Sequence, residues 1–266
     1  MNLIKLTDPT CLRSFLNTDR AWADYALGDL EPELFQQTDW YGAEEQGALI
    51  ALAMIYRGLQ PPICFLMGDE RGVDLILAQA VRLSEIGLSV RDEHLSVLDK
   101  YYRDNGTWPM WKMALEAADF QSVPGDALDL TLADVPDLRA LYAFGGGDAF
   151  SPEEITRGVF CGIRQAGQLI AVAGTHVVSD NGCVAALGNV MTHPDWRGRG
   201  LATIATSAVV ARLIDRGVST IGLSVSRENA AAIRVYEKLG FKKHVAFHEG
   251  NAVRKSEIHY SEWSQR

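Results

Sequence analysis

The stretch that decides the fold reads Gly188-Asn-Val-Met-Thr-His-Pro-Asp-Trp-Arg-Gly-Arg-Gly-Leu-Ala-Thr203. It begins like the end of a β-strand and leads into a run from Leu201 to about Asp215 with apolar residues at helical spacing. Gly198 and Gly200 permit a tight turn and let a ligand approach bare backbone. A helix start leaves N–H groups unpaired and carries the positive end of the helix dipole. The turn therefore predicts an anion site sized for a pyrophosphate.

The segments around this turn predict a mixed α/β fold. Three successive antiparallel strands are expected at Val159–Arg164, Leu169–Val178 and Val184–Thr192, with turns at 165–167 and 180–182. After the helix, a strand over Thr220–Val225 and a helix over Asn229–Leu239 complete one βαβ crossover. The closing strands are expected at Phe241–Phe247 and Ala252–His259, paired with each other.

The start of this half of the chain is also well punctuated. We expect a short strand at Asp129–Leu132 and a helix capped by Asp134 that runs to Ala143. Gly145-Gly-Gly147 predicts a flexible break. Ser151-Pro-Glu-Glu154 is typical of a capping box with proline at the first helical position, which predicts another helix start.

The first half of the chain has a different character. Residues 1–126 hold 10 basic and 20 acidic residues, whereas residues 127–266 hold 15 and 14. We therefore predict two domains with a boundary after Asp126. Apolar runs at Gly47–Tyr56 and Ile63–Met67 predict two strands, and Tyr101–Leu115 is expected to pack under the sheet. This half contains no recognisable catalytic motif.

Composition excludes several classes of protein. The chain has 266 residues, of which 47% are hydrophobic, so a core can form without disulfides. Its four cysteines are scattered without metal-ligand spacing and are expected to be small buried hydrophobes; we expect no metal. A net charge of −9 argues against nucleic-acid or anionic membrane partners. No secretory leader or membrane-spanning run is visible, which favours a cytoplasmic protein.

Two motifs together resemble the GNAT superfamily of N-acetyltransferases. The family's Arg/Gln-x-x-Gly-x-Gly/Ala pattern is matched by Arg197, Gly200 and Ala202. About thirty residues on, Asn229-Ala-Ala-Ala-Ile-Arg-Val-Tyr-Glu-Lys-Leu-Gly-Phe241 is similar to the family's second motif. The resemblance covers roughly residues 127–266, and the Thr-His-Pro wording is most like the glycine N-acyltransferase branch. Residues 1–126 fit a degenerate second domain of the same fold, which would wall the acceptor side.

The resemblance implies a binding role for each matching position, with acetyl-CoA as the acyl donor. Its pyrophosphate would be held by backbone N–H groups of Arg197, Gly198, Arg199, Gly200, Leu201 and Ala202, with a hydroxyl from Thr203. Its pantetheine arm would lie along the strand residues Val190, Met191 and Thr192, where family sheets splay. Asn229 would contact that arm or hold the second helix against it.

The resemblance also assigns the proton donor. Tyr236 would lie near the thioester sulfur and protonate the leaving thiolate. Many members carry a glutamate base where this chain has Ser224, which cannot act as a base unaided. The sequence offers four alternatives for the base. They are water alone, a water molecule ordered by Asn189, the imidazole of His176, and the imidazole of His193.

These observations predict an enzyme that moves an acetyl group from acetyl-CoA to a primary amine by direct attack in a ternary complex. No cysteine lies near either motif on a plausible nucleophile turn, which argues against a covalent acyl-enzyme. Two alternatives stay open: a non-catalytic acyl-CoA sensor, and an N-acyltransferase that uses longer acyl donors. The acceptor, a small molecule or a peptide, and the oligomeric state are left open by the sequence.

Overall fold

The computed structural model describes residues 1–145, 150–179, 181 and 183–255. The chain divides into two compact units, both discontinuous in sequence. Unit 1 comprises Met1–Thr7, Gln37–Trp108 and the chain from Phe247 onward, and unit 2 comprises Asp8–Gln36 and Pro109–Ala246. The sequence-based boundary after Asp126 follows charge, whereas these units follow contacts. The assignment of functions to the two halves stays a prediction.

Unit 1 is built on a mixed sheet ordered β1-β2-β3-β4-β5-β12. Its strands are β1 (Asn2–Leu6), β2 (Thr38–Glu45), β3 (Ala48–Tyr56), β4 (Ile63–Gly68), β5 (Glu85–Arg91) and the C-terminal part of β12 (Lys242–Arg254). Helices α4 (Glu70–Gln79) and α5 (Leu95–Tyr101) belong to the same unit. All neighbours are antiparallel except β4 and β5, which α4 connects as a crossover.

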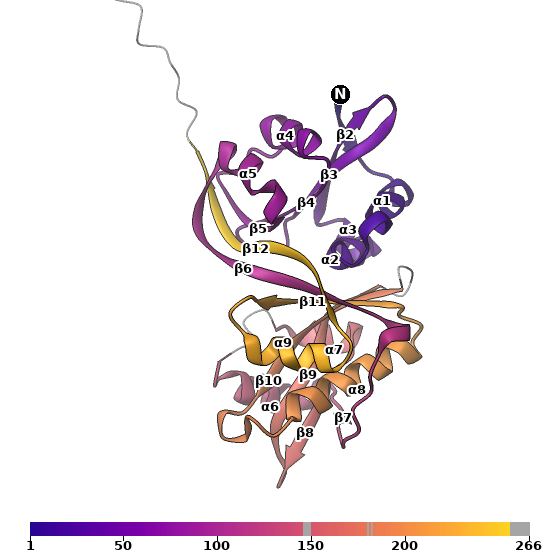
Figure 1. Cartoon of the computed structure of the whole chain (residues 1–266), viewed down its shortest axis with the longest axis vertical. Coiled ribbons are helices and arrows are strands. Elements are labelled where there is room, and N and C mark those ends of the chain that lie inside the picture. Colours follow the sequence, from indigo (N-terminus) through magenta and orange to yellow (C-terminus); the bar gives the residue numbers. More distant parts are fainter. Residues whose placement is uncertain (146–149, 180, 182, 256–266) are drawn as a thin grey trace, which may run out of the picture. The chain divides into compact units, whose positions relative to one another are not determined.

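Unit 2 carries the second sheet, ordered β6-β11-β10-β9-β8-β7 (Figure 1). Its strands are the C-terminal part of β6 (Tyr102–Glu116), then β7 (Leu128–Asp129), β8 (Cys161–Gln165), β9 (Gln168–Ser179), β10 (Val184–Thr192) and β11 (Thr220–Ser226). Its helices are α1 (Pro9–Leu16), α2 (Asp24–Gly28), α3 (Pro32–Phe35), α6 (Val135–Tyr142), α7 (Pro152–Arg157), α8 (Leu201–Asp215) and α9 (Ala230–Lys238). Only β10 and β11 are parallel among the described strands of this unit, and α8 connects them.

The two units have the same order of strands and helices, and the last strand of each sheet comes from the other half of the sequence. In each, four antiparallel strands are followed by a helix and a parallel strand, β4-α4-β5 in unit 1 and β10-α8-β11 in unit 2. The next antiparallel strand comes from the other half of the sequence. Residues Phe247–Val253 of β12 pair with β5, and Met110–Glu116 of β6 pair with β11. Because of this exchange, unit 1 includes the chain from Phe247 onward, whereas unit 2 is discontinuous because residues 8–36 belong to it.

The unit 2 sheet has a different cover on each face. Helices α8 and α9 pack against a core that includes Met113, Leu187, Leu223 and Val225. Alternate residues of a strand point to opposite faces. Gly222, next to Leu223, accordingly faces Asp24 of α2 on the other side. Helices α2, α6 and α7 contact β9 on this second face.

The structure confirms most of the elements expected after residue 150. The helix over Leu201–Asp215 and the strand over Val184–Thr192 have the expected limits. The stop at Gly240, with φ of 101°, is a Schellman motif, since the N–H of Phe241 donates to Tyr236 O and that of Gly240 to Glu237 O. The capping box at Ser151 is present, with Glu154 accepting from Ser151 N.

Other expectations are wrong. The expected pairing of Phe241–Phe247 with Ala252–His259 is wrong, because residues 242–254 form the single strand β12, which pairs with β5; residues 256–259 lie outside the described residues. Residues 102–116 form a strand within the sheets and do not pack beneath one. Asp134 makes no side-chain cap for α6 and instead accepts from Thr131. Cys11 and Cys183 are exposed. The break at 145–147 and the turn at 180–182 fall largely outside the described residues.

Candidate active site

The turn between β10 and α8 presents bare backbone to solvent. Residues Arg197–Gly200 are exposed. Gly198 and Gly200 have φ of 75° and 77°, and no heavy atom lies within 4 Å of the position that a Cβ would occupy on either residue. No hydrogen bond is recorded for the N–H groups of Gly198, Arg199 and Gly200 among the described residues. The first-turn N–H groups of α8, a helix of 15 residues, add further unpaired donors. An anion fits this set of donors.

The two arginines of the turn are held by their neighbours. The Arg197 guanidinium donates from Nε to Thr192 O at 3.3 Å. The Arg199 guanidinium lies over the Trp196 ring, 4.5 Å from its centroid, and donates to Asp195 O. Both charges therefore lie beside the free N–H groups, where they favour an anion further.

Strands β10 and β11 separate at the point where the resemblance implied a splay. They pair only from Val184–Leu187 with Thr220–Leu223. Beyond Leu187 the β11-facing edge of β10 has no paired strand among the described residues. At the same point β10 bulges, because Asn189 and Val190 together oppose only Ala173 of β9. Asn189 has φ of 52°, unusual for a residue other than glycine.

The structure places Val190, Met191 and Thr192 on this unpaired edge. Met191 is buried, and on the other edge of β10 it pairs with Val172 of β9. The Thr192 hydroxyl is buried without a hydrogen-bond partner. An extended ligand can therefore add to this edge like a strand, as the sequence-based hypothesis requires.

Tyr236 lies on the α9 side of the separation. It is 7% exposed and belongs to the same apolar cluster as Leu187 and Leu223, the last pair before the strands part. Its ring meets Phe241 edge-on, 5.9 Å between centroids. Burial raises the pKa of Tyr236 to about 12, so the phenol keeps its proton at neutral pH. A protonated phenol is the form that a proton donor needs.

Asn229 and His193 form helix caps, and Thr203 is a buried residue of α8. Asn229 caps α9, since its Oδ1 accepts from Ala232 N at 3.0 Å. Thr203 is buried at 5% exposure in the first turn of α8. His193 caps the short 3₁₀ turn before Arg197 through Nδ1, which accepts from Asp195 N, and its ring meets Phe144 edge-on. This cap gives His193 a structural role.

On the second face, the side chains of His176, Glu154 and Asn189 contact one another. His176 of β9 contacts Glu154 of α7, with Nδ1 2.9 Å from Oε1. Asn189 Nδ2 donates to Glu154 Oε2 at 3.1 Å. A Cβ on Gly188 would overlap His176 Nε2, so this imidazole covers the backbone where β10 and β11 part. Sequence reasoning named His176 and Asn189 only as separate alternatives, and Glu154 only as a helix cap.

A buried ion pair lies next to this group. Lys112 Nζ is 2.6 Å from Asp24 Oδ1, and the two side chains are 2% and 0% exposed. Lys112 is the cross-strand partner of Ser224, and its Nζ also lies 4.8 Å from the Tyr25 ring centroid. Burial raises the pKa of Asp24, while Lys112 opposes that rise. Asp24 Oδ2 has no hydrogen-bond partner.

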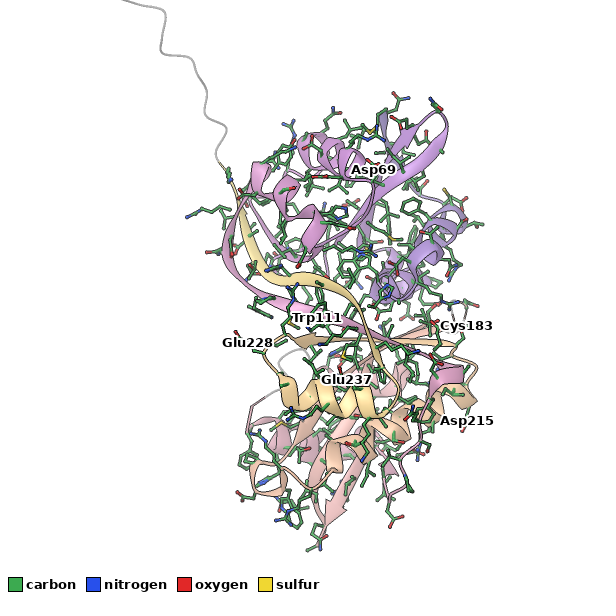
Figure 2. All side chains as sticks on the ribbon, viewed as in Figure 1. Asp69, Trp111, Cys183, Asp215, Glu228 and Glu237 are labelled. Atoms are coloured by element: carbon green, nitrogen blue, oxygen red, sulfur yellow. The ribbon has the colours of Figure 1, made fainter. Side chains whose placement is uncertain are left out.

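The equivalent turn of unit 1 has a different arrangement of polar groups. There, β4 leads into α4 through Asp69, labelled in Figure 2, whose carboxylate accepts from Arg71 N. A hydrogen bond from the Arg71 side chain lowers the pKa of Asp69, which keeps it anionic. Asp69 and Glu70 place negative charge where the turn in unit 2 has free N–H groups. The first half thus shares the topology without the binding turn.

Neither a metal-binding cluster nor a membrane-spanning helix is found in the part of the chain that the structure describes. Among those residues, no group of three or more His, Cys, Asp or Glu side chains is arranged to hold a metal ion. Within the same residues, no helix is both long and apolar enough to cross a membrane.

Comparison with known proteins finds similarity in the part of the chain that contains the β10–α8 turn. The Acetyltransferase (GNAT) family model matches residues 131–241. A [ribosomal protein bS18]-alanine N-acetyltransferase of Escherichia coli strain K12 is 40% identical over 81 residues, which cover 30% of this chain and 53% of the relative. The match therefore spans about half the length of that curated relative.

Solved structures extend the likeness to the whole chain. The structure of an acetyltransferase assigned to the GNAT family, from Novosphingobium aromaticivorans, is 25% identical with a TM-score of 0.53, over 72% of this chain and 84% of that one. A tandem GNAT protein from the clavulanic acid biosynthesis pathway covers 95% of this chain and 98% of its own at a TM-score of 0.57. At 13% identity that second likeness concerns the fold alone.

Residues 131–241 thus form a domain of the GNAT family of acetyltransferases. The residues of unit 1 share the fold, as the tandem neighbour and the repeated topology indicate. The expected fold class, a mixed sheet with two GNAT-like parts, is confirmed.

Proposed function

We propose that this protein transfers an acetyl group from acetyl-CoA to a primary amine by direct attack in a ternary complex. The observation that carries the proposal is the juxtaposition in unit 2 of an unpaired β10 edge with the free N–H groups of residues 198–200. The family match and the curated relative's name support the reaction type.

Each part of the site has a place in this reaction. The backbone of Arg197–Ala202 would bind the pyrophosphate and fix the position of the donor. Acetyl-CoA supplies the activated acyl group as its thioester. Residues Val190–Thr192 would hold the pantetheine arm by backbone hydrogen bonds, which orients the thioester between the two faces of the sheet. Tyr236 would give its proton to the departing thiolate.

Thiol release tests the proposal. The purified chain is incubated with acetyl-CoA and, separately, an alanyl peptide, a lysyl peptide, spermidine and trifluoroethylamine, and free thiol and acetylated product are both measured. Amine-dependent release with an acetylated product supports it. Binding of acetyl-CoA without release from any amine would favour the acyl-CoA sensor, an alternative that Ser224 at the usual glutamate position keeps in view.

A further inference from the structure

The imidazole of His176 lies beside the point where β10 and β11 part. Its Nε2 lies over the backbone of Gly188, one residue beyond Leu187, the last β10 residue paired with β11. Leu187 faces the cluster that contains Tyr236, so Gly188 faces the opposite side of the sheet. A proton acceptor at His176 and a proton donor at Tyr236 would therefore flank the separated strands from opposite faces.

The contacts of His176 set its tautomer. Nδ1 is 2.9 Å from a carboxylate oxygen of Glu154, and an ionised carboxylate can only accept. The shorter contact to Glu154 assigns the proton to Nδ1 and the lone pair to Nε2, since Asn189 Nδ2 lies farther from Nδ1, at 3.4 Å. No hydrogen bond to Nε2 is recorded among the described residues. The side chain is 22% exposed, so solvent reaches this imidazole.

Glu154 is itself held in place by three donors. Its Oε2 accepts from Ser151 N and from Asn189 Nδ2, both at 3.1 Å, while Oε1 faces His176. The Asn189 backbone is fixed in turn, because the buried Tyr142 hydroxyl donates to Asn189 O at 2.9 Å. The β10 bulge, the α7 cap and the imidazole are thus one connected hydrogen-bond network, which limits the orientations open to His176.

Charged neighbours from every packed element are compatible with a cationic acceptor. Besides Glu154 of α7, helix α2 contributes Asp24 and the Tyr25 ring, whose centroid is 6.0 Å from that of His176. Strand β6 contributes Lys112, whose charge is paired with Asp24. Among the described residues, the Glu154 carboxylate forms no ion pair with a Lys or Arg side chain.

The geometry points to His176 as the general base of the transfer, positioned by Glu154 and Asn189, in place of the glutamate that the chain lacks at Ser224. This inference rests on the proposed function.

An ammonium acceptor gives one proton to Nε2 of His176, which releases it to solvent. The neutral nitrogen then bonds to the thioester carbon and the C–S bond breaks. The departing thiolate takes a proton from the Tyr236 hydroxyl. The acetylated nitrogen still carries one proton more than the amide product, and it gives this proton to the Tyr236 phenolate, which restores the phenol.

His176→Gln tests the inference. With the amine of the panel that gives the fastest release, we expect kcat/KM at neutral pH to fall by about 10²- to 10⁴-fold, the usual worth of a general base. Acetyl-CoA affinity should stay within about twofold. The defect should shrink as pH rises, and with trifluoroethylamine, which is neutral at the assay pH. His248→Gln, which disrupts the His248–Asp92 pair of unit 1, is the matched control and should leave kcat/KM unchanged.

The outcomes separate the two proposals. A His176→Gln variant within threefold of the wild type, or a defect that is the same at every pH and for both classes of amine, overturns the role as base and leaves the transferase intact. No amine-dependent release by the wild type overturns both. Nitrogen-15 NMR of histidine-labelled protein adds a readout that needs no acceptor: the Nδ1–H tautomer supports the inference and the Nε2–H tautomer contradicts it.

Discussion

At the scale of the residue, two side chains near the strand separation, Glu154 and Asn189, each have more than one structural role. Glu154 completes a capping box and also orients His176. Asn189 adopts φ of 52° and also braces Glu154. Because Glu154 has both roles, the sequence pattern identified it as a helix cap but did not reveal its hydrogen bonds with His176 and Asn189. A capping box has a local signature, whereas the contact between Glu154 and His176 depends on how α7 packs on β9.

Tyr236→Phe should lower kcat more than it weakens acetyl-CoA binding. The phenol is buried, and burial raises its pKa to about 12, so it carries its proton throughout the neutral range. Removing that proton should cost about 10²-fold in kcat, at the lower end for general acids, with a change in acetyl-CoA Kd below about threefold.

The control for Tyr236 is Tyr101→Phe, which removes a phenol of unit 1 that bonds Asp74. It should leave both constants unchanged. Because the folded-state pKa is near 12, the wild-type activity attributable to Tyr236 should not decline with rising pH until well above pH 10. An unchanged kcat for Tyr236→Phe would remove its role as the acid.

At the scale of the element, β10 is the part of the fold that the sequence predicted best. Its limits, its parallel partner and its loss of pairing beyond Leu187 all agree with the expectation. Local alternation and the glycine turn predict the limits and the parallel partner, whereas the loss of pairing was implied by the family resemblance. The prediction for the closing strand β12 was wrong for the complementary reason. Its pairing with β5 joins residues about 160 positions apart, and such a partner leaves no local signal.

The segment of residues 8–36 is the element that sequence analysis placed least well. Charge assigned it to a first domain, whereas its contacts place it in unit 2. Its helix α2 carries Asp24, whose partner Lys112 lies 88 positions along the chain on β6. A lone Asp and a lone Lys look like ordinary surface residues in the sequence. Only the exchange of β6 into the unit 2 sheet brings them together.

Lys112→Met should destabilise unit 2 strongly and in a pH-dependent way. It leaves the buried Asp24 without its counter-ion, which costs about 3–5 kcal/mol of unfolding free energy. Lys100→Met, at an exposed pair with Asp74, is the matched control and should cost about 0–1 kcal/mol.

The pH dependence follows from the direction of the Asp24 shift. Burial already raises its folded-state pKa, and loss of Lys112 raises it further. A group with a raised folded pKa stabilises the fold most at low pH, and that contribution is lost as pH rises through the folded pKa. The Lys112→Met defect should therefore be smaller at pH 5 than at pH 8 in denaturant titrations. A defect that is equal at both values would contradict an ionised Asp24–Lys112 pair.

At the scale of the whole molecule, the two units share one topology and differ at the turn after the fourth strand. In unit 2 the β10–α8 turn offers glycines and free N–H groups. In unit 1 the β4–α4 turn offers Asp69 and Glu70. The plan of strands is retained in both, because apolar cores fix it, while the anion site needs particular residues in one short turn. We therefore expect the donor to bind unit 2 alone.

Calorimetric titration with acetyl-CoA tests the central claim most directly. The wild type should bind one equivalent. Gly200→Val should weaken binding about tenfold or more, because a side chain at φ of 77° costs about 1–2 kcal/mol and distorts the turn. Gly167→Val strains the β8–β9 turn in the same way, at φ of 84° with open space, and should bind like the wild type. Absence of wild-type binding, or equal weakening by both variants, would contradict the assignment of residues 197–202 as the donor site.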